Sequence, residues 1–129
     1  MTFTEKRLMR KLDALRKAVR EFYTTSKQEE LSVLAGYIND IAFDVTFDAM
    51  SAYGKPDPGL FRAFADIYRE AAILIRTLVK GEEKILAKSM RDRAEIFERV
   101  VCGEDASKVF RELSDRNHND KEKIREESI

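Results

Sequence analysis

The sequence predicts an all-α protein, namely an antiparallel (up-down-up-down) four-helix bundle with a short fifth helix and a polar C-terminal tail. Two observations predict it. Apolar residues recur at helical spacing in every segment that can form a core, and no stretch alternates as a strand would. The breaks between these segments are short. We therefore expect a bundle domain over residues 1–113 and a charged, flexible tail over 114–129.

The first two helices are predicted from about Thr4 to Tyr23 and from just after Ser26 to about Tyr53. The first has an apolar seam formed by Leu8, Leu12, Leu15, Val19 and Phe22. Its remaining surface has an excess of Lys and Arg, whereas the second helix has an excess of Asp and Glu. An antiparallel hairpin of the two would place basic residues beside acidic ones.

The third helix is predicted from Asp57 to Gly81, with Asp57 as N-cap, Pro58 at the first helical position and Gly81 at the end. Two apolar rows run along it and cover roughly half of its circumference. This is more than a surface helix needs, so the third helix should pack against at least two neighbours.

Gly81 separates the third helix from a fourth, which is predicted to run from about Glu82 to Cys102. A single glycine leaves open whether the chain breaks or only kinks there. Gly103 ends the fourth helix, and a short fifth helix follows from Glu104 to about Leu113. The remaining residues, from Ser114, are almost wholly polar.

Composition narrows the function classes. The chain has 129 residues with 24 basic and 24 acidic side chains, so its formal net charge is zero and no global charge favours nucleic acid or membrane. No apolar run is long enough to cross a bilayer, and the N-terminus lacks the apolar segment of a signal peptide. The single cysteine, Cys102, makes the reducing cytoplasm the expected location.

Motifs for catalysis are missing. The only histidine, His118, lies in the tail, so the Glu-x-x-His pairs of a dimetal bundle are absent, and one cysteine with one histidine is too few for a zinc site. No glycine-rich phosphate loop or nucleophile elbow occurs. We expect no cofactor and no metal, and we expect Cys102 to be a small buried residue.

Asp40, Asp44 and Asp48 are spaced four residues apart and stack on one side of the second helix. Each such like-charge pair costs about 0.2–0.5 kcal/mol in an isolated helix. A divalent cation is one explanation, and salt bridges are the preferred one. The expected partners are on the first helix (Lys6, Arg7, Arg10) and on the third helix (Arg62, Arg69).

Phe43, Phe47 and Met50 form an apolar patch nearly opposite the face that contains Ile38 and Val45. Exposed apolar surface often marks an interaction site, and a symmetric dimer is the commonest form of one. Alternatively, the fifth helix or the N-terminal Met1 and Phe3 cover the patch. The residues that we assign to an interface are Phe43, Phe47, Met50, Val109 and Phe110.

Arg93 lies within the apolar arc of the fourth helix, one turn after Ser89. This position suggests a ligand or anion site, or a buried ion pair, because an unpartnered buried guanidinium is very costly. The other interpretation is an arginine at the edge of the arc, with its head in water or paired with Glu70 or Asp66.

The first helix also suggests nucleic-acid contact, since a row of cations can lie along phosphates. The residues are Lys6, Arg7, Arg10, Lys11, Arg16, Lys17 and Arg20. A solvated face, or a salt-bridge layer against the second helix, is the competing interpretation. We therefore expect a non-enzymatic bundle that acts by protein-protein association, with itself or within a larger complex. The alternative is a small nucleic-acid-binding module, as a possible subunit of a nucleoprotein complex.

Overall fold

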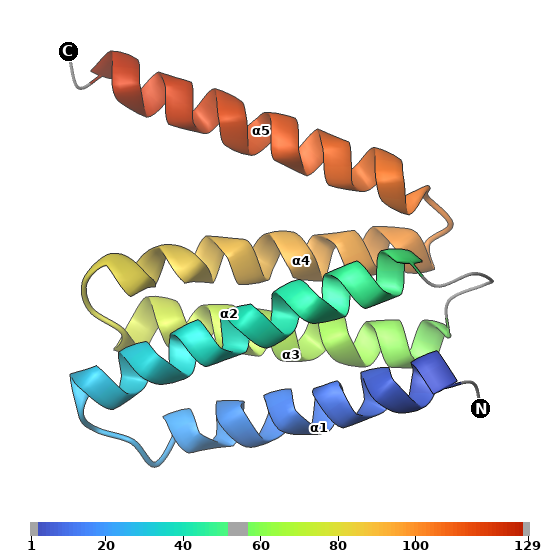
Figure 1. Cartoon of the computed structure of the whole chain (residues 1–129). Coiled ribbons are helices and arrows are strands. Elements are labelled where there is room, and N and C mark those ends of the chain that lie inside the picture. Colours follow the sequence, from blue (N-terminus) through green and yellow to red (C-terminus); the bar gives the residue numbers. More distant parts are fainter. Residues whose placement is uncertain (1–2, 52–56, 128–129) are drawn as a thin grey trace.

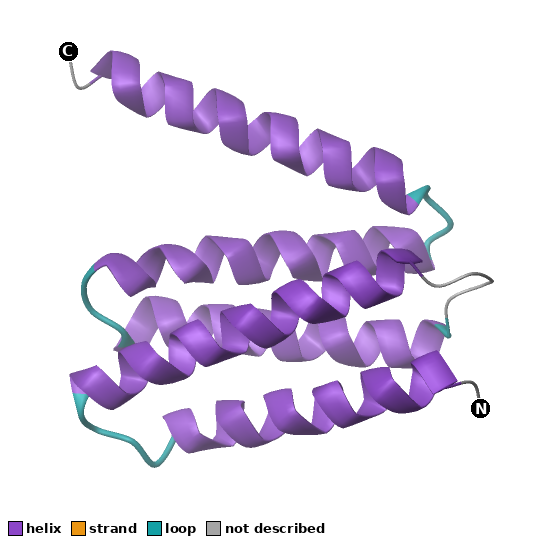
Figure 2. Cartoon of the chain, in the orientation of Figure 1, coloured by secondary structure: helices purple, strands orange, loops and turns teal. Residues whose placement is uncertain are grey.

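The computed structural model describes residues 3–51 and 57–127, with side chains for residues 3–49 and 57–116. In these residues every regular element is helical, which confirms the all-α prediction (Figure 2). The elements are α1 (Phe3–Phe22), α2 (Gln28–Ser51), α3 (Pro58–Leu78), the 3₁₀ helix η1 (Glu82–Ile85), α4 (Leu86–Val101) and α5 (Ala106–Glu127).

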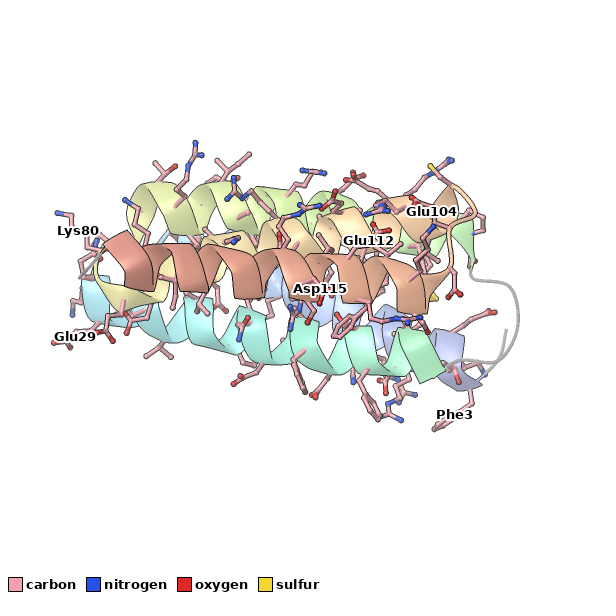
Figure 3. All side chains as sticks on the ribbon, turned by 90° about the horizontal axis from the view of Figure 1, so that it is seen from above. Phe3, Glu29, Lys80, Glu104, Glu112 and Asp115 are labelled. Carbon is pink, nitrogen blue, oxygen red and sulfur yellow. The ribbon has the colours of Figure 1, made fainter. Side chains whose placement is uncertain are left out.

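Helices α1 to α4 share one core. Helix α1 packs against α2 and α3, and α4 packs against the same two helices, whereas α2 and α3 make only marginal contact. Figures 1 and 3 together show the same arrangement, with α1 and α4 on opposite sides of the α2–α3 pair. Two helices that are consecutive in the chain are therefore diagonal to each other in space.

The core is filled by the predicted seams. The α1 seam from Leu8 to Phe22 is buried throughout, as are most residues of both apolar rows of α3. At the α3–α4 contact, the ring of Phe97 lies 4.8 Å from that of Phe61 and 5.7 Å from that of Tyr68, measured between centroids. Aromatic contacts of this kind add to the stabilisation that apolar burial gives the α3–α4 contact.

Both ends of α3 are set by local chemistry. Asp57 Oδ1 accepts hydrogen bonds from the backbone N–H groups of Gly59 (2.9 Å) and Leu60 (3.2 Å), and Pro58 occupies the first helical position. This confirms the predicted N-cap. The helix ends at Leu78, and Gly81 has a φ of 91°, a conformation that side chains disfavour. The chain therefore breaks at Gly81 and does not merely kink.

Gln28, the first residue of α2, closes the other end of α3. Its Nε2 donates to the carbonyl of Leu78 (2.9 Å), and its Oε1 accepts from the N–H of Lys80 (3.0 Å). A helix end leaves backbone groups without helical partners, and the Gln28 amide satisfies one at the last residue of α3 and one just beyond it. Figure 3 shows Glu29 and Lys80 at the same end of the molecule.

The fifth helix is longer than predicted. It runs to Glu127, so the expectation that it ends near Leu113 is wrong. Polar side chains with good helix propensity follow Leu113, and such residues extend a helix without adding to a core. Asp105 starts the helix by accepting a hydrogen bond from the N–H of Ser107 (2.9 Å). The flexibility expected for 114–129 stays a prediction.

Helix α5 is held to α4 near its beginning. Val109 and Leu113 pack against Ile96 and Val100 of α4 in a second, smaller apolar cluster. Beside it, both Glu104 and Glu112 accept hydrogen bonds from the guanidinium of Arg99 (2.7–2.8 Å). The later half of α5 diverges from α4 (Figure 1).

Candidate interaction surface

Helix α2 presents a row of exposed apolar side chains. Val33, Tyr37, Phe43 and Phe47 are 72%, 49%, 62% and 68% exposed. At about 100° per residue they fall within an arc of roughly 120° on the outward side of the helix. We call these four residues the α2 apolar face. Large apolar side chains gathered on one exposed arc are typical of an interaction site.

The sequence explains why this face is left uncovered. Helix α2 also has a core-facing side, where Ala35, Ile38, Ala42 and Val45 are fully buried. Helix α2 also contacts α1 through Asp48 on one flank and α4 through Asn39 on the other. The opposite side therefore has no neighbour among the described elements that pack closely on α2.

The internal covers considered for this face are not seen in the described side chains. Val109 is fully buried against α4, which corrects its assignment to an interface, and Phe110 of α5 is half exposed. Phe3 is 77% exposed and points away from the helices (Figure 3). The side chain of Met50 and all of Met1 lie outside the described residues.

The three stacked aspartates have different environments. Asp48 lies 2.8 Å from Lys11 Nζ and 3.3 Å from Arg7 Nε, so a salt-bridge layer joins α2 to α1. Asp40 and Asp44 are exposed and make no ion pair within the described residues. No group of three His, Cys, Asp or Glu side chains in that part of the chain is placed to hold a metal ion.

The expected partners on α3 are wrong, because α2 and α3 hardly touch. Arg69, expected near Asp40, instead donates from Nη2 to Glu98 of α4 at 2.7 Å. This pairing raises the pKa of Arg69 and lowers that of Glu98. Arg69 therefore joins α3 to α4.

Arg93 lies between α4 and α2. Its Nη1 donates to Ser89 Oγ (3.1 Å), Ser89 Oγ donates to Asn39 Oδ1 (3.2 Å), and its Cζ lies 6.0 Å from the centre of the Phe43 ring. The guanidinium is partly buried, and burial lowers its pKa. Within the described residues it makes no salt bridge with Glu70 or Asp66, so the one interpretation that paired it with either of these carboxylates is wrong.

The Arg93 cluster contains two buried donors without partners among the described atoms. They are Arg93 Nε and the hydroxyl of Tyr68, a residue that is fully buried in α3. Burial also raises the pKa of Tyr68. The Arg93 guanidinium also lies over the ring of Phe43, at the inner edge of the α2 apolar face.

The seven basic residues of α1 do not form one surface. Arg7 and Lys11 face Asp48 of α2. Two adjoining open hollows of 490 and 430 Å³ lie along α1 and α3; Arg16 lines both, and Arg20 lines the first. The charged residues of these hollows are of both signs: Arg16, Arg20 and Arg62 with Asp13, Asp66 and Glu70. The other basic residues of α1, namely Lys6, Arg10 and Lys17, are exposed.

Cys102 corrects another expectation, because it is exposed and not buried. It caps the end of α4, directly before Gly103, whose φ is 100°. The N–H groups of Gly103 and Glu104 bond back to Val100 and Arg99, which is the usual glycine-terminated helix end. The turn carries Cys102 beyond the last core position.

Comparison of the chain with protein-family models, with curated proteins and with solved structures gave no match. Among the described residues, no helix has both the length and the apolar character that a bilayer crossing requires.

Proposed function

We propose that this protein is a non-enzymatic helical bundle that works by associating with another protein molecule through the α2 apolar face. The observation that carries the proposal is the exposure of Val33, Tyr37, Phe43 and Phe47 on one arc of one helix. Burying a side chain of this size contributes about 1.5–3 kcal/mol, so a partner that covers the whole face would gain several kcal/mol.

The arrangement that we assign to the first four helices is the up-down-up-down bundle. The α1–α2 and α3–η1 connections lie at one end of the molecule and the α4–α5 connection at the other, which supports this assignment (Figure 1). In such a bundle α2 is fixed between α1 and α4. A rigid support of this kind lowers the entropy lost when a partner binds.

Nucleic-acid binding through α1 is the alternative, and its support is weaker. The outward-facing Lys6, Arg10 and Lys17 favour it. However, Arg7 and Lys11 are paired with Asp48, and Arg16 and Arg20 share their hollow with carboxylates that would repel phosphate. We also keep the cytoplasm as the expected location, because of the single cysteine.

Site-specific photocrosslinking tests the proposal. A photoreactive phenylalanine analogue replaces Phe47, and in a matched control it replaces Ile73, which is 61% exposed on α3. The analogue at position 47 should give a discrete crosslinked species in cells, and again when the purified chain is mixed with its partner. The crosslinked partner is either a second copy of this chain or a different protein. The analogue at position 73 should give no such species. Equal crosslinking at both positions, or none at position 47, would overturn the proposal.

A further inference from the structure

The outward arc of α2 is acidic as well as apolar. Glu29, Asp40 and Asp44 are exposed, and at about 100° per residue they fall on the same arc as the α2 apolar face. None of the three makes an ion pair within the described residues. Helix α2 contains no Lys, Arg or His. The arc therefore has negative charge and no counter-charge of its own.

Two of these carboxylates lie in the middle of the α2 apolar face. Along the helix, Val33 and Tyr37 precede Asp40 and Asp44, and Phe47 follows them. From Val33 to Phe47 the helix rises by about 21 Å. A partner that covers this length must enclose both carboxylates between its apolar contacts. Because a buried unpaired charge is strongly unfavourable, such a partner must supply cations at its centre.

The cations of this chain that flank α2 have other contacts. On the side toward α1, Arg7 and Lys11 are paired with Asp48. On the side toward α4, the guanidinium of Arg93 lies over the ring of Phe43. The counter-charge for the middle of the face must therefore come from the partner.

Helix α2 also restricts the backbone conformation of the partner. Its own N–H and C=O groups are bonded within the helix, so an extended segment lying on it would leave backbone groups without partners. An α-helix satisfies its own backbone groups. It also places side chains four residues apart on one face, which is the spacing of Asp40 and Asp44.

We propose that the partner of the α2 apolar face is a basic amphipathic helix of a different protein. Over about 15 residues it presents apolar side chains at both ends and two Lys or Arg residues, four apart, in the middle. An amphipathic helix laid along an apolar surface is a common mode of recognition. This inference rests on the proposed function and adds the chemistry of the partner.

A second copy of this chain does not have the required pattern. If α2 packed on α2, carboxylates would meet carboxylates, with no basic residue in either helix. Like charges placed together across an interface are strongly unfavourable. The outward side of α1 supplies cations at Lys6, Arg10 and Lys17, but no apolar row that could cover Val33 and Phe47.

A designed peptide tests the inference on the whole chain. The probe is an amphipathic helix of about 18 residues, with leucines in its first and last turns and two lysines, four residues apart, between them. A matched peptide has glutamates in place of the two lysines. Fluorescence anisotropy of the labelled peptides gives the Kd of each. The photoreactive analogue at position 47, with position 73 as control, shows where each peptide binds.

The basic probe should bind the wild-type chain and should crosslink at position 47 and not at position 73. The acidic peptide should bind at least about tenfold more weakly, because its glutamates would face Asp40 and Asp44. High salt should reduce this difference, because salt screens the charge pairs.

Charge reversal on α2 should exchange the preference for the two peptides. A variant with Asp40→Lys and Asp44→Lys should bind the basic probe at least about tenfold more weakly than the wild type does, and should bind the acidic peptide more tightly. The control variant, with Glu82→Lys and Glu83→Lys in the exposed η1, has the same change in net charge. Its Kd for the basic probe should change by less than about twofold, because the altered charges lie outside the contact.

Circular dichroism checks that each variant is folded. If the lysine variant does not fold, Asp40→Asn with Asp44→Asn takes its place and should also weaken binding of the basic probe. Failure of the basic probe to bind at up to about 1 mM, equal binding of the two peptides, or an equal loss in the η1 control would overturn the inference.

Crosslinking in cells separates failure of this inference from failure of the proposed function. Mass spectrometry identifies the segment that the analogue at position 47 captures, which should be a basic amphipathic helix. If that segment belongs to a second copy of this chain, or lacks basic residues, the proposed function stands and only the chemistry of the partner is wrong. If position 47 captures nothing, both are wrong.

Discussion

Lys11 and Asp48 form the closest charge contact between α1 and α2, with Nζ 2.8 Å from Oδ2. Both side chains are largely buried, with 22% and 13% of their surface exposed, and Arg7 approaches the same carboxylate oxygen. The opposite charges of the two helices predicted a contact of this kind. Its position near the end of α2 sets the register of the hairpin.

Replacing Asp48 by Asn should destabilise the fold. The change removes the charge that two basic residues share in a partly buried site, and hydrogen bonds to charged groups are worth about 1.5–3 kcal/mol. We expect a loss of about 1–2 kcal/mol in the free energy of unfolding, measured by urea denaturation. Asp44→Asn, one turn away and exposed, is the control and should change it by less than about 0.5 kcal/mol. Equal losses for both would show that the Asp48 contacts contribute nothing.

Replacing Tyr68 by Phe should leave stability unchanged or raise it. The Tyr68 hydroxyl is buried without a partner among the described atoms, so the change removes an unsatisfied polar group and keeps the ring that packs on Phe97. Thermal unfolding measures the effect. A loss of more than about 1 kcal/mol would mean that the hydroxyl makes a hydrogen bond, such as one to a bound water near Arg93.

Acid should destabilise the fold through Glu98 and Glu104. Hydrogen bonds from Arg69 and Arg99 hold the pKa of these two carboxyls below the ordinary value of about 4.3. A lowered folded-state pKa gives stability that is complete above the unfolded value and is lost as the pH falls through the folded value. The melting temperature should therefore decrease as the pH is lowered from about 4.3. Between about pH 6 and pH 8 these two groups should leave the melting temperature unchanged.

Glu104→Gln tests this pH dependence. The variant should melt below the wild type at neutral pH and approach it in acid, because it lacks the carboxylate that protonation neutralises. Glu82→Gln, at an exposed site in η1, is the matched control. A constant difference between wild type and Glu104→Gln at every pH would contradict the assignment.

Two glycine substitutions should change the free energy of unfolding in opposite directions. Gly36 lies inside α2, and a Cβ added there would meet nothing within 4 Å, so Gly36→Ala should stabilise by about 0.5–1 kcal/mol. Gly81 has a φ of 91°, so Gly81→Ala should destabilise by about 1–2 kcal/mol. Thermal unfolding of both variants checks the pair. A stabilising Gly81→Ala would show that the chain has no need for a sharp break between α3 and η1.

Much of the local structure could be predicted from the sequence. The N-cap at Asp57 and the buried seam of α1 are confirmed, because capping and apolar periodicity depend on residues close in the chain. Phe43 and Phe47 were placed opposite the core face for the same reason, and their side chains are exposed. Their role in association stays a prediction.

Other features depended on distant residues. The partner of Arg69 is Glu98 on α4, and Cys102 is exposed because its helix ends in a glycine turn. Val109 was assigned to an interface, but it is buried within the chain because α5 lies against Ile96 and Val100 of α4. In each case, the environment of the side chain depended on how one part of the fold is placed against another.

The sequence by itself determined which stretches of the chain form the first four helices and which side of each is apolar. Both follow from residue spacing within a few turns. Only the tertiary structure decided which helices are neighbours. Helices α2 and α3 follow each other in the chain but lie diagonally, since α3 has two apolar rows and buries them against α4 and α1. The choice of neighbours depends on burying several helix faces at the same time. The apolar periodicity of a single helix therefore does not predict it.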